Sequence, residues 1–199
     1  MDRKSLTRNI KLIKAELVNY SKKRRASNPK DGIIDTLIFI LHTNLKSIEN
    51  LMKDPKTQGD RFIFVDHYIR SITRAFNTDI LSAIEKDINK HLDACDTQNS
   101  MGKKIDKLFE THEKHPKGFK WKKIAHGLRI IRNAYAHADP KLWNKDKEFL
   151  KEIAQKKYIK YFSINNEGEV VFEDNSRYFL STIILAENFL IELNKLSKK

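Results

Sequence analysis

The side chains best suited to chemistry lie together in one short segment, Arg132-Asn133-Ala134-Tyr135-Ala136-His137. The guanidinium of arginine is permanently charged, and its planar fork of N–H donors matches the oxygens of a phosphate. The imidazole of histidine can give or take a proton near neutral pH. A guanidinium, an amide and an imidazole so close in sequence therefore suit phosphate chemistry, and together they could cleave RNA without a metal ion.

The surrounding sequence LRIIRNAYAHADP, residues 128–140, resembles the signature of HEPN domains, the all-helical ribonucleases of prokaryotic toxin and antiphage (abortive infection) systems. The family pattern is Arg, a polar residue that is often Asn, three variable residues, and His. The resemblance implies that His137 acts as general base or acid, that Arg132 holds the phosphate, and that Asn133 orients the phosphate or the histidine. Some members carry a tyrosine two residues after the histidine, where a partner protein silences them. Asp139 stands at that place, which puts this mode of neutralisation in doubt.

The spacing of Arg132 and His137 limits how one helix can use them. Five residues of an ideal helix turn through about 500°, so the two side chains lie about 140° apart around the axis, whereas Asn133 and His137 share a face. They can meet at one phosphate if the helix loosens before Pro140, or if a second copy of the helix faces the first. HEPN domains dimerise and place two Arg-His pairs at a shared cleft. We therefore expect a homodimer with a composite active site.

The chain is strongly basic, with a formal net charge of +13 over 199 residues. Such a charge favours polyanionic partners, because lysine and arginine neutralise phosphates and release counterions. RNA is the expected partner, although lysines on solvated helix faces can also serve solubility alone. The densest cluster is 22–25, and a second basic run lies just before the signature. The residues of this region predicted to bind RNA are Lys117, Lys120, Lys122, Lys123 and Arg129.

The elements that must position these residues are mostly helices. Apolar residues recur at helical spacing over 10–20, 33–51, 61–93 (with a break or kink near 77–79), 105–109, 119–138 and from 175 or 176 to the terminus. Turn residues separate the helices, at 28–32, 54–59, 96–102 and 115–118. The β-formers of 158–163 and 169–172 flank the turn residues 165–168 and predict one hairpin. The sequence thus predicts an all-α helical bundle, a single HEPN-like domain over 1–199, with a small β-hairpin insertion before the C-terminal helix.

Other function classes find less support. No GxGxxG or GxxxxGK pattern is present, which disfavours kinases, GTPases and dinucleotide-binding proteins. The only cysteine, Cys95, is expected in the core or at its boundary and fits a reducing cytoplasm. No secretory signal and no membrane span are expected, and the longest apolar run, 33–41, is too short to cross a bilayer.

Two further arginine and histidine groupings have simpler interpretations. The pair Arg61 and His67 is flanked by bulky residues and carries no amide, so we interpret it as structural. His112 and His115 lack the additional ligands that zinc requires, and neither a metal nor a cofactor is expected. His126 lies on the signature helix and is expected to be solvated or packed, or to line a cleft.

The leading functional hypothesis is a metal-independent endoribonuclease, a toxin or antiphage effector. It would act by attack of the ribose 2′-hydroxyl on the adjacent phosphate, giving a 2′,3′-cyclic phosphate and a 5′-hydroxyl. A cognate antitoxin or sensor protein is a further expected partner. The alternative is a non-catalytic helical module that binds RNA or a protein, with the signature retained as a binding cleft or as structure. In a purely structural interpretation of the signature, Arg132 pairs with a carboxylate, Asn133 caps locally and His137 ends the helix. A third hypothesis is an antitoxin or immunity partner.

Overall fold

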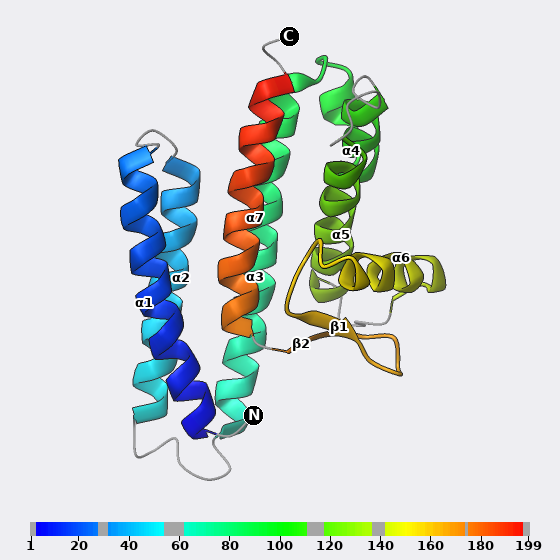
Figure 1. Ribbon diagram of the computed structural model, residues 1–199. Coiled ribbons are helices and arrows are strands. Elements are labelled where there is room, and N and C mark those ends of the chain that lie inside the picture. The colour runs from blue at the N-terminus through cyan, green and yellow to red at the C-terminus, as the bar shows by residue number, and fades with distance from the viewer. Residues whose placement is uncertain are drawn as a thin grey trace.

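The computed structural model describes residues 3–27, 32–53, 62–110, 118–136, 142–173 and 175–196. These residues form an all-α fold with one small antiparallel hairpin directly before the last helix, as predicted (Figure 1). The helices are α1 (Arg3–Ser27), α2 (Gly32–Lys53), α3 (Phe62–Ile88), α4 (Met101–Glu110), α5 (Gly118–Ala136), α6 (Asn144–Gln155) and α7 (Asn175–Leu196). The strands are β1 (Phe162–Ile164) and β2 (Val170–Phe172), and short 3-10 turns span Asn89–His91 and Asp96–Gln98.

The long helices stand side by side in pairs. Figure 1 shows α1 beside α2, then α3 beside α7, then α4 beside α5, with α6 lying crosswise and the hairpin below it. Helix α3 is central, because it contacts α2, α5, α7 and the start of α4. The signature helix α5 is therefore enclosed by α3, α4 and α6, and these neighbours determine which of its side chains can reach solvent.

Apolar residues at helical spacing make the core that holds the bundle. On α2, residues Ile34, Leu41 and Leu45 are fully buried, and on α7 the rings of Phe179 and Phe189 are buried too. Burying a large apolar side chain contributes about 1.5–3 kcal/mol, so these stripes supply the main force for packing. Across the described helices, no stretch combines the length and the apolar character that crossing a bilayer requires.

Helix α3 runs without interruption through 77–79, where the sequence predicted a break or kink. That prediction is wrong, because the amide of Asn77 is satisfied inside the bundle. Its Nδ2 donates to the carbonyl of Thr73 at 2.9 Å, and its Oδ1 accepts a bond from the buried hydroxyl of Tyr178 at 2.5 Å. The polar residue therefore fastens α3 to α7 and does not cap a new helix.

A buried arginine joins the N-terminal helix pair to the last helix. The Arg24 side chain is 2% exposed, with Nη1 2.6 Å from Oδ1 of Asp35 on α2 and Nε 2.6 Å from Oε1 of Glu187 on α7. The hydroxyl of Tyr20 also donates to Glu187. Two carboxylates compensate the desolvation of one guanidinium, which a buried charge requires.

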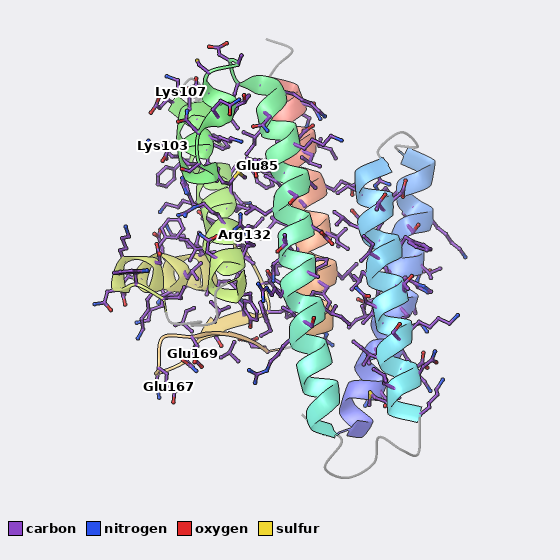
Figure 2. All side chains as sticks on the ribbon, turned by 180° about the vertical axis from the view of Figure 1, so that it is seen from behind. Glu85, Lys103, Lys107, Arg132, Glu167 and Glu169 are labelled. Carbon is purple, nitrogen blue, oxygen red and sulfur yellow. The ribbon has the colours of Figure 1, made fainter. Side chains whose placement is uncertain are left out.

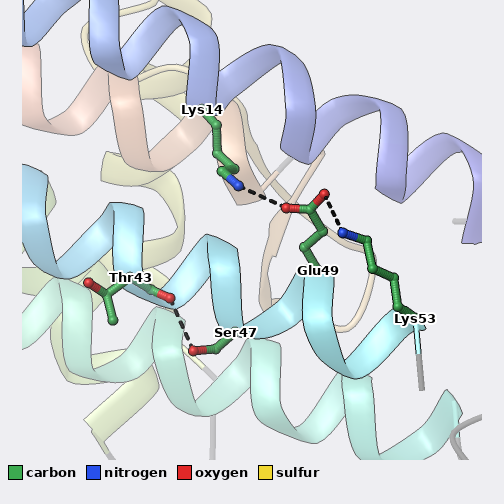
Figure 3. Close-up of polar contacts among 5 residues, drawn as sticks. All are labelled: Lys14, Thr43, Ser47, Glu49 and Lys53. Atoms are coloured by element: carbon green, nitrogen blue, oxygen red, sulfur yellow. Dashed lines mark hydrogen bonds and ion pairs between the residues drawn. The ribbon is translucent and has the colours of Figure 1, made fainter.

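Partly exposed polar contacts also connect α1 and α2 (Figure 3). The Nζ of Lys14 donates to Oε2 of Glu49 at 2.8 Å, and Lys53 lies 3.2 Å from the other oxygen. Hydrogen bonds from the two lysines hold the pKa of the Glu49 carboxyl below its usual range. One turn earlier, the hydroxyl of Ser47 donates to the carbonyl of Thr43 at 3.1 Å.

Helix α6 is an element that the sequence reasoning did not predict. It buries only Leu150 and Ile153, so its apolar pattern is short. It packs where α5 carries Gly127, because a Cβ there would lie 3.0 Å from Cδ1 of Ile159 and 3.6 Å from Cγ2 of Ile153. The hairpin that follows pairs Phe162 with Phe172. Its first strand is shorter than predicted, since 158–161 forms bends and no strand before β1.

Candidate functional site

Two arginines of the signature segment, Arg129 and Arg132, lie in the second half of α5. Arg129 packs over Gly102 near the start of α4, since a Cβ at Gly102 would lie 3.6 Å from the Arg129 Nε. Arg132 follows almost one turn later, on the side of α5 that faces α3 (Figure 2). The Nε atoms of both guanidiniums are buried, and neither has a hydrogen-bond partner among the described residues. Two permanent charges are therefore held close together along one helix.

Arg132 forms no ion pair with a carboxylate in the described part of the chain. This matters for the alternative in which Arg132 is purely structural, because that alternative requires a carboxylate partner. Asn133 is partly buried beside it. Glu85, which Figure 2 shows higher in the space between α3 and α4, is bound by the buried Lys104 at 2.6 Å. That carboxylate is already compensated by a cation.

Several predicted residues lie outside the described residues. Among the site predictions these are His137 and Lys117, so the position of the histidine relative to Arg132 remains a prediction. Arg61, His112, His115 and Asp139 lie outside them as well, as does the side chain of His67. Of the turns, 28–31, 54–59 and 115–117 are not described, and the described part of α5 ends at Ala136.

The predicted RNA-binding lysines do not form one continuous surface. Lys122 reaches toward α4, where its Nζ lies 3.1 Å from Oδ1 of Asp106, on the same side as Arg129. Lys123 turns to α6 instead, and its Nζ donates to Oε1 of Glu152 at 2.5 Å. Lys120 lies with Lys123 on that second side, 5.7 Å above the ring of Tyr158. The structure thus divides the basic run between two faces of α5.

His126 occupies the α4 side of α5 and is bonded to Asp106, with 3.1 Å between Nε2 and Oδ1. The ring of Phe149 meets the imidazole edge-on. Burial lowers the pKa of His126, and the positive charges of Arg129 and Lys122 act in the same direction, while Asp106 opposes them. His126 is therefore a packed and hydrogen-bonded histidine, and its neutral form is favoured.

Tyr135 fastens the end of α5 to the hairpin. Its hydroxyl donates to the carbonyl of Val170 at 3.1 Å, and its ring lies 5.1 Å from that of Phe172. Burial raises the pKa of Tyr135 to about 12, with the charge of Arg70 on α3 working against the rise and Glu169 adding to it. Tyr135 is therefore a packing residue.

Sequence reasoning missed a group of aromatic and lysine side chains at the other end of α5. Lys123 lies 4.6 Å above the ring of Phe119, and Lys156 lies 5.9 Å above that of Tyr158. Lysine and tyrosine recur over 156–161, and this pattern is a usable signal for such a group, although 158–163 also has the composition of a strand. Hydrogen bonds from Lys123 and Lys156 lower the pKa of Glu152 to about 2.

Neither a metal-binding group nor a thiol site emerges from the described residues. No three His, Cys, Asp or Glu side chains gather closely enough there to hold a metal ion. Cys95, expected in the core or at its boundary, is exposed in the turn before α4.

The described residues thus form an all-α bundle in which the second half of α5 carries two partly buried arginines, Arg129 and Arg132. No protein-family model matches the chain, and no curated protein or solved structure shows significant similarity to it.

Proposed function

We propose that the protein is a metal-independent endoribonuclease of the HEPN type, acting as a toxin or antiphage effector. The observation that carries the proposal is the pair of buried Nε atoms on Arg129 and Arg132, which have no hydrogen-bond partner among the described residues. A buried donor without a partner costs about 1–3 kcal/mol. The Nε atoms themselves are closed to solvent, but both side chains are only partly buried. Phosphate oxygens are the acceptors that suit the exposed part of two such guanidiniums, and they would compensate the charges at the same time.

The proposed chemistry needs only groups of this chain. The base removes the proton of a ribose 2′-hydroxyl, the 2′ oxygen bonds to phosphorus, and the bond from phosphorus to the 5′ oxygen breaks. An acid then protonates the departing 5′ oxygen, so the products are a 2′,3′-cyclic phosphate and a 5′-hydroxyl. His137 is assigned the proton transfers, and Arg132 stabilises the charge on the phosphoryl oxygens. Asn133 orients the phosphate or the histidine. DNA lacks the attacking hydroxyl and would not be cleaved.

Cleavage of a labelled single-stranded RNA by the purified protein in EDTA tests this function. Arg132→Ala should slow cleavage about 10²- to 10³-fold, the usual cost of losing one donor to a developing charge. His137→Ala should slow it about 10²- to 10⁴-fold. The 5′ fragments should carry a cyclic phosphate, detectable by mass spectrometry.

His126→Ala is the matched control, because it removes a histidine from the same helix that is already bonded to Asp106. It should cleave at the wild-type rate within a few-fold, and circular dichroism should show helical content unchanged in all three variants. Cleavage that survives both Arg132→Ala and His137→Ala would assign the activity elsewhere. RNA binding without any cleavage would favour the non-catalytic module.

A further inference from the structure

The aromatic and lysine side chains near the start of α5 form one connected group. The cation–ring contacts form two sets: Lys123 lies above Phe119, while Lys120 lies above both Trp121 and Tyr158 and Lys156 lies above Tyr158. Glu152 closes the group by accepting bonds from Lys123 at 2.5 Å and Lys156 at 2.7 Å. We name these residues the aromatic–lysine cluster: Phe119, Lys120, Trp121, Lys123, Lys156 and Tyr158.

The aromatic–lysine cluster has two kinds of ring. Trp121 is anchored in the core, where it meets Phe189 edge-on at 5.7 Å. Phe119 is 62% exposed, and Tyr158 is partly exposed in the turn after α6. Lys157 and Tyr161, on either side of Tyr158 in sequence, have φ angles of 53° and 64°. Non-glycine residues adopt this left-handed conformation only where the surroundings fix it, so the turn that presents Tyr158 is well defined.

The charge around these rings is strongly one-sided. The two segments that carry the cluster, 118–123 and 152–161, contain six lysines and one acidic residue, Glu152. Lys120, Lys156, Lys157 and Lys160 are exposed. A protein partner normally meets a surface whose centre is depleted of lysine. Exposed rings among lysines instead match a single-stranded nucleic acid, because bases stack on the rings and phosphates meet the charges.

We propose that the aromatic–lysine cluster binds unpaired nucleotides of RNA, with Phe119 and Tyr158 stacking on bases and the lysines contacting phosphates. The choice of RNA rests on the proposed nuclease function. Lys120 and Arg132 are 12 residues apart on α5, or about 18 Å along the axis. Twelve residues also turn through about 1,200°, so the two positions lie about 120° apart around the axis, and a single strand of several nucleotides has to pass around α5 to reach both. Binding and cleavage are then separable by mutation.

Fluorescence anisotropy with an oligouridine of about 12 nucleotides and a hairpin duplex of similar mass tests the surface directly. All proteins carry Arg132→Ala, so that the probe is not cut during the titration. Phe119→Ala and Tyr158→Ala should each weaken oligouridine binding about 5- to 100-fold, the usual loss of one stacked base, and leave duplex binding unchanged. Phe119→Tyr and Tyr158→Phe keep the rings and should bind as the parent does.

Trp143→Ala is the matched control, because it removes an aromatic ring that is 78% exposed but lies away from the cluster. Trp143 directly precedes the first residue of α6, whereas Lys156 and Tyr158 follow its last residue. The variant should bind oligouridine as tightly as the parent. A charge variant gives a second readout: Glu152→Gln removes the carboxylate shared by Lys123 and Lys156, and should tighten binding and steepen its salt dependence. Glu148→Gln, on the same helix but bonded to Lys151, should have a smaller effect.

The outcomes separate this inference from the nuclease proposal. If Phe119→Ala and Tyr158→Ala bind oligouridine normally, or weaken duplex binding equally, the stacking surface is refuted even if RNA is cleaved through Arg132. If the two variants lose oligouridine binding while the wild type never cleaves RNA, the surface stands and the nuclease proposal fails.

Discussion

His126 and Arg132 share a helix but meet different surroundings. His126 is packed against Phe149 and bonded to Asp106, whereas the Nε of Arg132 has no partner among the described residues. His126 is a satisfied polar residue that serves the fold, whereas no carboxylate of the described residues pairs with Arg132. The packed surroundings of His126 are one of the outcomes that the sequence analysis expected for it.

The lowered pKa of His126 predicts a pH dependence of stability. Below pH 6.5, the ordinary pKa of histidine, His126 takes up a proton in the unfolded chain before it does so in the folded protein. The free energy of unfolding therefore falls as the pH falls. Urea unfolding at about pH 8 and about pH 5.5 measures this change. His126→Gln should reduce the difference between the two conditions.

Asp106→Asn should do the opposite, because Asp106 is the group that raises the pKa of His126. With that carboxylate removed, the pKa falls further and the loss of stability on acidification grows. An unchanged difference in both variants would mean that His126 does not contribute to the pH dependence.

The sequence predicted which residues of the site are chemically suitable, but it did not predict how α5 turns them. Lys122 and Lys123 are adjacent, yet each residue of a helix advances by about 100°, so one meets Asp106 and the other Glu152. The direction depends on α4 and α6, which contact α5 from different sides. The sequence of α5 indicates these contacts only at Gly127, where the missing side chain allows the close approach of Ile159.

At the scale of elements, the long helices and the hairpin followed from apolar spacing and turn residues. Helix α6 did not, because it buries only two side chains and is preceded by Trp143, with no side-chain cap. Its position comes from packing against α5 and β1. The prediction of a break in α3 was wrong for a related reason. The hydrogen bond from Tyr178 to Asn77 joins residues 101 positions apart, so the sequence around Asn77 does not indicate it.

The hairpin has a clear role, because it fixes the end of α5 through Tyr135. Tyr135→Phe removes the hydrogen bond to the Val170 carbonyl but keeps the ring contact with Phe172. It should lower the free energy of unfolding by about 0.5–1.5 kcal/mol, measured by urea denaturation. Tyr161→Phe, a partly exposed tyrosine before β1, should change it by less than about 0.5 kcal/mol. Equal stability of both variants would show that the bond is not needed.

At the scale of the whole molecule, the proposed composite site requires two copies of the chain. A mixture of Arg132→Ala and His137→Ala proteins tests this, because each variant lacks a different group. With random pairing, half of the dimers contain one copy of each variant. Each of these dimers has one intact site, whereas a wild-type dimer has two, so the mixture should recover about a quarter of wild-type cleavage. Each variant alone should remain inactive.

Sedimentation of the same samples supplies the control for pairing. A mixture that contains dimers but stays inactive would place both groups of each site on one subunit. A mixture that remains monomeric would remove the expectation of a homodimer altogether.

The buried guanidinium of Arg24 has a consequence for the order of assembly during translation. Its partner Glu187 is 163 residues further along the chain, so α1 and α2 leave the ribosome long before that carboxylate exists. Until then water, with Asp35, solvates the guanidinium in place of Glu187. The contact between Arg24 and Glu187 therefore forms only when α7 docks, which makes the final packing of the first two helices a late step of assembly.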